Sequence, residues 1–187
     1  MKNMLVMAFL CAPLALFCQS ETENKQVKTK LEAFTEETGT LIETTEEEIG
    51  KLGNSISIKV LKLKNLITGA KVNGILFETG SNAAFASSRK RTSLLDSDEI
   101  DGLVKSLEIM KDAVTKTRPS FTELKYKSRT GFEVGTYFDT DISTSNKTGE
   151  KKWMYYFKNS NSESKNALSP ADFMALCGYI EAAKSKL

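Results

Sequence analysis

The sequence predicts an α+β fold in which two pseudo-symmetric copies of one unit pack as a single domain, each copy an antiparallel strand meander followed by one helix. Two segments, 94–108 and 167–181, share one helical pattern of apolar residues. Runs of alternating apolar and polar residues, typical of half-buried strands, precede both segments. One such unit cannot cover its sheet alone, and 187 residues with 40% hydrophobic side chains suit one core of modest size.

Residues 1–20 are predicted to be a secretory signal peptide. Lys2 gives a positive start, an apolar run extends from Met4 to Phe17, and the chain is polar again by Ser20. The run has about 14 residues, fewer than the roughly 20 that a membrane-spanning helix needs. We therefore expect an exported protein, periplasmic or secreted, whose mature chain is a single domain at 21–187 without a transmembrane span.

The cysteines bear on how the N-terminus is processed. Cleavage after Cys18, cleavage after Ser20 and lipid attachment at Cys18 are the alternatives, although the bulky Phe17 departs from the small residue of a lipid-attachment motif. Cys11 lies inside the predicted signal peptide, so the body of the protein keeps Cys177 alone. We therefore expect no internal disulfide framework.

Copy one is expected at about residues 39–114, after a short acidic helix in the lead-in 24–37. Alternating apolar residues predict its strands, which we place at 41–49, 56–63, 71–79 and 83–92. The alternation changes phase between Val60 and Leu61, which predicts a β-bulge in the second of these strands. The helix then begins after Asp96, a predicted N-cap residue followed by Glu99 at the third helical position.

Copy two is expected at about residues 117–187. Its strands are placed at 122–126, 132–138 and 153–157. Ser169 is the predicted N-cap of its helix, with Pro170 at the first helical position and Asp172 at the third. The apolar positions of the two helical segments match at a constant offset of 73 residues, namely Leu95 with Leu168, Ile100 with Phe173, Leu103 with Leu176, and Leu107 with Ile180.

A second pair of segments matches upstream of the helices. Residues 74–79 are similar to residues 135–140, at an offset of 61 residues. Because this offset is 12 residues smaller than that of the helices, copy two is predicted to carry an insertion. We place the insertion at 141–150, where the sequence is rich in Ser, Thr, Asn and Gly, as in a long hairpin loop.

Charge is unevenly distributed, although 26 basic and 24 acidic residues nearly balance. Residues 21–50 hold nine acidic side chains and three lysines, a net charge of −6, whereas residues 51–187 carry a net charge of +7. An anionic partner for the basic body, an acidic segment that covers it, and ordinary solubility are three interpretations of this asymmetry.

The chain contains no histidine, which excludes Ser-His-Asp and Cys-His catalysis, histidine metal ligands and imidazole acid–base transfer. A segment that starts at Asp139 has the acidic start of a calcium loop, but Thr144 stands where such a loop needs glycine. The acidic clusters at 96–101 and 46–48 are explained by helix capping and by solvation. We therefore expect no catalytic residue, no cofactor and no metal, and we expect that the protein is not an enzyme.

Aromatic and basic residues gather at the last strand of copy two. Trp153, Tyr155 and Phe157 share one face, which is either the core under the helix or a stacking surface for bases. Met154 and Tyr156 then face the other way, and an exposed apolar sheet face indicates a partner surface. With the basic cluster that we place on the equivalent strand of copy one, the predicted binding surface comprises Arg89, Lys90, Arg91, Lys152, Met154 and Tyr156.

Two resemblances follow from these patterns. Strand meanders followed by one helix, occurring twice, resemble the layout of the Whirly and PUR-type folds that bind single-stranded nucleic acid. The motif at 93–103, SLLDSDEIDGL, is similar to that of small, uncharacterised exported proteins of Bacteroidota-type bacteria, over most of residues 30–187. The first resemblance implies a fold without a residue-level binding motif, and the second implies export without an assigned activity.

The sequence favours an exported, non-enzymatic binding or interaction module that uses a sheet face or a dimer interface. Its expected partner is a protein or another component of the cell envelope, or a second copy of the chain in a homodimer. A single-stranded nucleic-acid-binding protein is the first alternative, which the predicted export disfavours. A carboxylate-dependent hydrolase is the second alternative, which is disfavoured because helix capping and solvation account for the acidic clusters.

Overall fold

The computed structural model describes residues 27–53, 55–80, 91–139, 152–160 and 162–187. The predicted signal peptide at 1–20 and the predicted insertion at 141–150 lie outside these residues. No helix in the described part of the chain is long and apolar enough to cross a membrane. The helix predicted within 24–37 is short, α1 at Lys30–Thr35.

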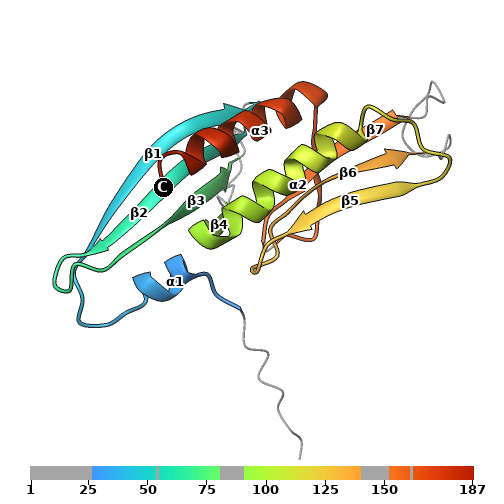
Figure 1. The fold of residues 1–187 in the computed structure, drawn as a ribbon. Helices are drawn as coiled ribbons and strands as arrows, with labels where there is room; N and C mark the ends of the chain where they lie inside the picture. The colour runs from blue at the N-terminus through green and yellow to red at the C-terminus, as the bar shows by residue number, and fades with distance from the viewer. Residues whose placement is uncertain (1–26, 54, 81–90, 140–151, 161) are drawn as a thin grey trace, which may run out of the picture.

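Two antiparallel four-stranded sheets make up the fold, and each is followed along the chain by one helix (Figure 1). The first sheet has the order β1 (Ile42–Leu52), β2 (Ile56–Asn65), β3 (Lys71–Thr79), β4 (Arg91–Asp96). A 3₁₀ turn, η1 (Ser97–Glu99), then leads into α2 (Ile100–Ala113). The second sheet has the order β5 (Thr122–Lys127), β6 (Glu133–Asp139), β7 (Lys152–Lys158), β8 (Asn166–Leu168), and α3 (Pro170–Lys184) follows it. The predicted fold class is therefore confirmed.

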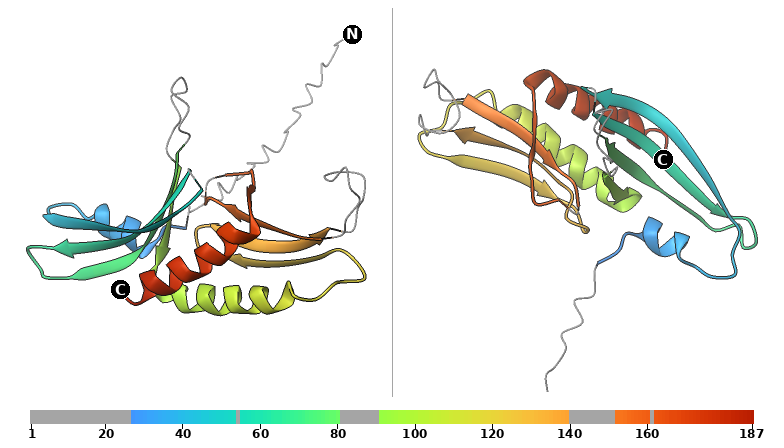
Figure 2. Two further views of the ribbon diagram at one scale, coloured as in Figure 1. Left: turned by 90° about the horizontal axis from the view of Figure 1, so that it is seen from above. Right: turned by 180° about the vertical axis from the view of Figure 1, so that it is seen from behind.

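One hydrophobic core joins the two units. α2 and α3 pack against each other on the same side of both sheets, and α3 contacts β1 and β2 of one sheet and β7 and β8 of the other (Figure 2). Phe77 of the first sheet stacks on Phe132, just before β6, with 4.4 Å between the ring centroids. Because both helices and both sheets contribute to this core, neither unit would bury its apolar face alone.

The change of phase in β2 has a different cause from the one predicted. β2 pairs with β3 in a continuous register, and the described irregularity lies in β1, between Glu48 and Gly50. Ile58 and Val60 point into the main core under α2 and α3, whereas Leu61 and Leu63 point to the opposite face of the sheet. The predicted bulge in β2 is therefore wrong, because this strand is buried on both of its faces.

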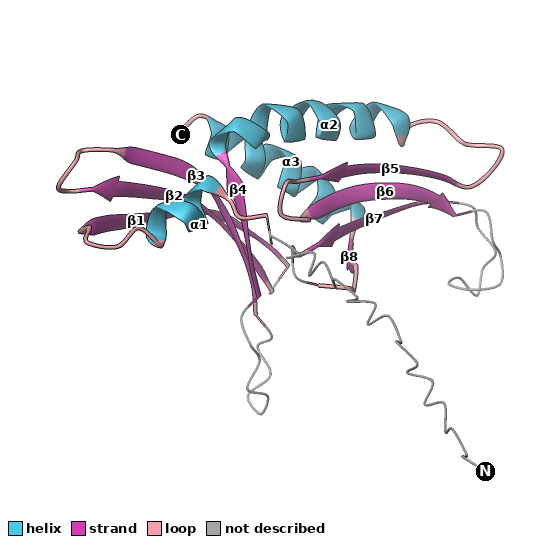
Figure 3. Ribbon diagram, turned by 90° about the horizontal axis from the view of Figure 1, so that it is seen from below, coloured by secondary structure: helices cyan, strands magenta, loops and turns pink. Residues whose placement is uncertain are grey.

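α1 supplies the cover for that opposite face (Figure 3). Leu31 and Phe34 of α1 pack on the second apolar cluster of the first sheet, formed by Leu61, Leu63 and Leu76. The helix begins with a capping box, in which the Thr29 hydroxyl accepts from the Glu32 N–H at 2.9 Å. A six-residue helix is unstable by itself, so its position depends on these contacts.

Asp96 anchors α1 to the rest of the fold. Its carboxylate is 1% exposed and accepts from the backbone N–H groups of Lys30 and Leu31, at 2.8 and 3.1 Å. Arg129, in the turn between β5 and β6, donates to the same carboxylate from Nη1 at 2.6 Å. Asp96 thus precedes η1 as predicted, but its side chain holds α1 and the second sheet in place. Glu99 reaches back to the Asp96 N–H at 3.4 Å.

The start of α3 follows the sequence prediction more closely. The Ser169 hydroxyl accepts from the Asp172 N–H at 3.0 Å, and Pro170 occupies the first helical position. Leu168 pairs with Tyr155 of β7, as Leu95 pairs with Ile75 of β3. The helices and the strands directly before them are therefore equivalent in the two units.

The second sequence match, between residues 74–79 and 135–140, does not correspond to equivalent strands of the two sheets. Gly74 lies on β3, the third strand of its sheet, whereas Gly135 lies on β6, the second strand of the other sheet. A Cβ at Gly74 would lie 2.2 Å from the Leu95 carbonyl oxygen, and one at Gly135 would lie 2.7 Å from the Tyr156 ring. Both glycines therefore lie where a neighbouring group leaves no room for a side chain, in strands that are not equivalent.

Gly74→Ala is expected to lower the free energy of unfolding by about 1–3 kcal/mol, because the added methyl group meets backbone at 2.2 Å. Gly178→Ala is the matched control, since a Cβ at this position in α3 meets nothing within 4 Å. That change should raise the free energy of unfolding by up to about 1 kcal/mol through better helix propensity. Urea denaturation of both variants measures the two effects, and equal shifts would contradict the packing at Gly74.

Asp96→Ala is expected to lower the free energy of unfolding by about 2–4 kcal/mol, because it leaves the N–H groups of Lys30 and Leu31 without their acceptor. Asp98→Ala is the control, since Asp98 binds the same guanidinium at 3.0 Å but is 41% exposed. It should cost less than about 1 kcal/mol. Denaturant titration compares them, and a loss at Asp98 as large as that at Asp96 would contradict the anchoring role.

Candidate binding face

The outer face of the second sheet, the face turned away from α2 and α3, is the candidate site. No described helix covers it, whereas α1 covers part of the corresponding face of the first sheet (Figure 3). Successive side chains of a strand point to opposite faces of the sheet, and Leu124, Tyr126 and Tyr155 point into the core. The alternate positions are Glu123, Lys125 and Lys127 on β5, Glu133, Gly135 and Tyr137 on β6, and Lys152, Met154, Tyr156 and Lys158 on β7.

Lysines dominate this surface, which we call the basic face and define by Lys125, Lys127, Lys152, Lys158 and Lys165. Lys165, from the loop before β8, lies over the face with its ammonium 4.1 Å from the centroid of the Tyr156 ring. Two acids are neutralised within the face. Glu133 pairs with Lys158 at 3.3 Å, and Glu123 pairs with Lys165 at 2.8 Å.

Lys125 and Lys127 remain on the edge strand β5 as exposed cations. No carboxylate among the described residues lies within ion-pair distance of either ammonium. Among the described side chains of the face, five lysines exceed two acids, Glu123 and Glu133, so the face has a net positive charge.

Tyr156 is buried, although it belongs to the predicted binding surface. The side chain lies on the outer face but is only 2% exposed, because its ring lies over Gly135 and beneath Lys165. Its hydroxyl donates to Glu123 Oε1 at 2.6 Å. Burial, and then the hydrogen bond to Glu123, raise the pKa of Tyr156. Tyr156 therefore supports the face from within and does not present its ring to a ligand.

The other predicted surface residues divide between two places. Lys152 is exposed and Met154 half-buried, and both lie on the basic face. Arg91 lies on β4 of the first sheet, where its Nη1 donates to the Ser162 hydroxyl at 3.2 Å. β4 is the equivalent of β8 and not of β7, so the predicted combination of Arg91 with Lys152 does not form. Arg89 and Lys90 lie outside the described residues.

Trp153, Tyr155 and Phe157 lie on the inner face; Tyr155 and Phe157 belong to the core, which confirms the core interpretation for them, whereas Trp153 is half-buried beyond the end of α2. Tyr155 packs against Phe173 of α3 with 4.7 Å between ring centroids, and desolvation raises its pKa. The indole N–H of Trp153 donates to the Lys116 carbonyl at 2.9 Å, and its ring contacts Phe138 edge-on. Neither ring is available for base stacking on the outer face.

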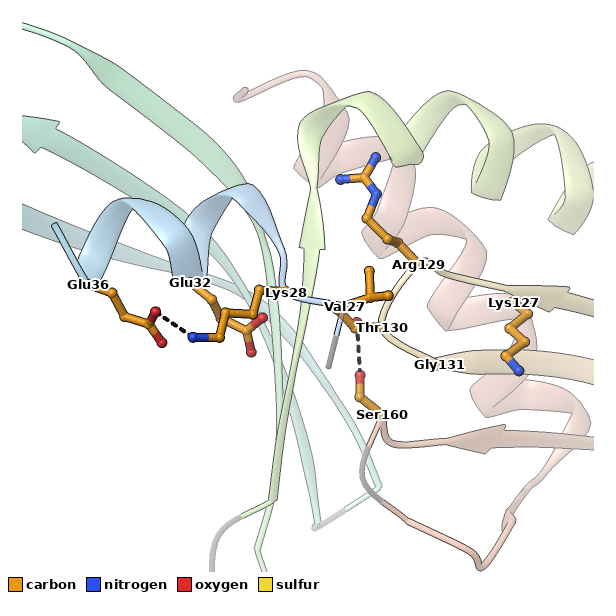
Figure 4. Close-up of a pocket in the computed structure, with 9 residues that line it drawn as sticks. All are labelled: Val27, Lys28, Glu32, Glu36, Lys127, Arg129, Thr130, Gly131 and Ser160. Carbon is orange, nitrogen blue, oxygen red and sulfur yellow. Dashed lines mark hydrogen bonds and ion pairs between the residues drawn. The ribbon is translucent and has the colours of Figure 1, made fainter. Parts of the chain in front are cut away.

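A cavity of about 420 Å³ adjoins the basic face between α1 and the turn that connects β5 to β6 (Figure 4). Lys127 lines both the cavity and the face. The other charged groups of the lining already have partners: Lys28 donates to Glu36 at 2.6 Å, Glu32 accepts from the Thr29 N–H at 2.7 Å, and Arg129 donates to Asp96, outside the lining, at 2.6 Å. The lining residues are Val27, Lys28, Glu32, Glu36, Lys127, Arg129, Thr130, Gly131 and Ser160.

Part of this face could have been predicted from the alternation of residues in β5. The segment TELKYK places Glu123, Lys125 and Lys127 opposite Leu124 and Tyr126, so a period of two is enough to group the two lysines on an outer surface. No such signal identifies Lys165. It lies in a loop, and only the folded chain brings its ammonium over Tyr156.

Other chemistry is sparse in the described residues. They contain no group of three or more Cys, Asp or Glu side chains arranged to hold a metal ion. Cys177 is buried in α3, and desolvation raises the pKa of its thiol, which disfavours the reactive thiolate. No family model, curated protein or solved structure matches the chain.

Glu123 should make stability depend on pH. The hydrogen bonds from Lys165 and then Tyr156 lower its pKa below the ordinary value of 4.5. A lowered pKa in the folded state contributes stability above pH 4.5 that is lost as the pH falls toward the folded pKa. In urea titrations below pH 4.5, Glu123→Gln should therefore flatten the acid loss of stability, and Lys165→Met should flatten it in part. An unchanged slope in Glu123→Gln would contradict this pairing.

Proposed function

We propose that the protein is an exported, non-enzymatic binding module that holds an acidic polysaccharide on its basic face. The observation that carries the proposal is the pair of exposed lysines, Lys125 and Lys127, on a sheet face that no described helix covers. Clustered lysines on one face create a positive potential that attracts a polyanion. Export, which remains a prediction from residues 1–20, would place the module where such polymers occur.

The spacing of the lysines suits a repeating anion. Lys125 and Lys127 are two residues apart on one strand, hence roughly 7 Å apart along it. Lys152 and Lys158 lie two strands away on β7, roughly 10 Å across the sheet. Lysine is a flexible point charge, which suits carboxylate or sulfate groups repeated along a polymer better than one fixed small anion.

The aromatic residues favour a polysaccharide over single-stranded nucleic acid. Base stacking needs exposed rings along the path of the strand. Tyr156 is buried beneath Lys165, and Tyr137 is half-buried beside it. A polymer held by charge alone needs neither ring. The Tyr156 hydroxyl beside Glu123 is buried beneath Lys165 and does not reach a ligand on the face, so the proposal includes no catalysis.

Retention on an immobilised acidic polysaccharide, such as heparin, tests this function. Lys125→Glu/Lys127→Glu should elute at lower salt and bind at least about tenfold more weakly, because salt screens charge-mediated binding and reversal repels the polymer. Lys105→Glu/Lys111→Glu, with the same change of charge on α2, is the matched control and should bind like the unaltered protein.

Two results would overturn the proposal. Equal losses in both double variants would show that retention follows net charge and not the basic face. A single-stranded oligonucleotide that displaces the protein from heparin at concentrations where soluble heparin does not would favour the nucleic-acid alternative instead.

A further inference from the structure

The cavity between α1 and the turn from β5 to β6 has two walls of different chemistry (Figure 4). Glu32 and Glu36 line it from the side of α1, and Thr130 and Ser160 line it from the side of the second sheet. Lys127 belongs both to this lining and to the basic face. The volume of about 420 Å³ is within the roughly 300–1,000 Å³ of small-molecule sites. The cavity can therefore hold a small ligand next to the lysines of the basic face.

Carboxylate oxygens are the hydrogen-bonding groups on the α1 wall. Oε2 of Glu32 accepts from the N–H and from the hydroxyl of Thr29, at 2.7 and 3.1 Å. Oε2 of Glu36 accepts from Lys28 at 2.6 Å. No described donor binds Oε1 of either residue. Because an ionised carboxylate accepts and does not donate, a ligand on this wall has to bring O–H or N–H groups.

The opposite wall offers hydroxyl groups and a cation. The Thr130 and Ser160 hydroxyls lie 3.2 Å apart, and each can donate or accept. The Arg129 guanidinium is already bound to Asp96 at 2.6 Å. Among the described residues, no carboxylate lies within ion-pair distance of the Lys127 ammonium. Lys127 is therefore the lining cation that remains for an anionic group.

We propose that the cavity holds a uronic acid residue of the polysaccharide, an inference that rests on the proposed function. The carboxylate of the sugar would pair with Lys127, and its ring hydroxyls would donate to Glu32 and Glu36. A sulfate ion has no donor for the α1 wall, and a neutral sugar has no anionic group for Lys127. A uronic acid carries both kinds of group on one ring, so it satisfies both walls.

Saturation-transfer NMR of the full chain with methyl glucuronide tests the role of Lys127. Lys127→Met should weaken binding of this sugar about tenfold, because the carboxylate loses its ion-pair partner. Lys125→Met is the matched control and should leave the affinity unchanged, since Lys125 is on the basic face but does not line the cavity. Methyl glucoside, which lacks the carboxylate, should bind the unaltered protein about tenfold more weakly than methyl glucuronide. Equal binding of the two sugars would overturn the inference.

A substitution that fills the cavity tests the location of the sugar independently of charge. Val27 lines the cavity and is 57% exposed, so Val27→Trp can occupy the space without disturbing the core. This variant should lose the methyl glucuronide signal. Ile109→Trp, at an exposed aliphatic position on α2, is the matched control and should keep it. Unaltered binding in Val27→Trp would contradict a sugar site in the cavity.

Heparin retention of the same variants separates this inference from the proposed function. If Lys125→Met and Lys127→Met both lower retention but bind methyl glucuronide equally well, the cavity inference fails and the proposed function stands. If methyl glucuronide binding depends on Lys127 but retention does not depend on Lys125, the proposed function fails and the cavity site stands.

A free amino acid is the competing ligand class, because it brings an ammonium group for Glu32 and a carboxylate for Lys127. The same NMR experiment with alanine distinguishes the two classes. Methyl glucuronide should bind more tightly than alanine, since its hydroxyls reach both walls. Tighter binding of alanine would overturn the assignment of a sugar.

Discussion

The buried carboxylate of Asp96 is the interaction on which the arrangement of the molecule depends. It lies where β4 ends and η1 begins, and it accepts hydrogen bonds from the backbone of α1 and from Arg129 of the second unit. A buried carboxylate is stable only when its oxygens are satisfied, so the elements that supply the donors have to meet at this point. The N-terminal helix, the first sheet and the turn of the second sheet are thereby held together.

Because Asp96 holds α1 beside the first sheet, the outer faces of the two similar sheets differ. α1 is held against the first sheet, where Leu31 and Phe34 cover an apolar cluster. The second sheet has no described helix in this position, and its strands carry lysines at the alternate positions instead. Gly135 makes room for the ring of Tyr156 beneath Lys165, so the ammonium groups are outermost. The proposed binding function follows from this difference between the sheets.

The candidate site could be predicted from the sequence only in part. Alternation correctly placed Met154 and Tyr156 on the face opposite Trp153 and Tyr155, because successive side chains of a strand point to opposite sides. It could not show that Tyr156 is buried there, since that depends on a glycine in the neighbouring strand and a lysine in a distant loop. The grouping of Arg91 with this strand failed because the predicted strands of copy two did not include β8, the short strand before α3 that is the equivalent of β4.

The sequence by itself determined the fold class, the two helices and most strands, because helical spacing, strand alternation and N-cap residues are local properties of the chain. Ser169 and Asp172 cap α3 as their spacing predicts. Only the tertiary structure decided what covers each sheet face. Leu61 and Leu63 needed α1 as a partner, and the side chain of Asp96 accepts from the backbone of α1, more than sixty positions away. These contacts depend on which apolar surfaces and polar groups are still without a partner once the helices and strands have formed. No local sequence pattern contains that information.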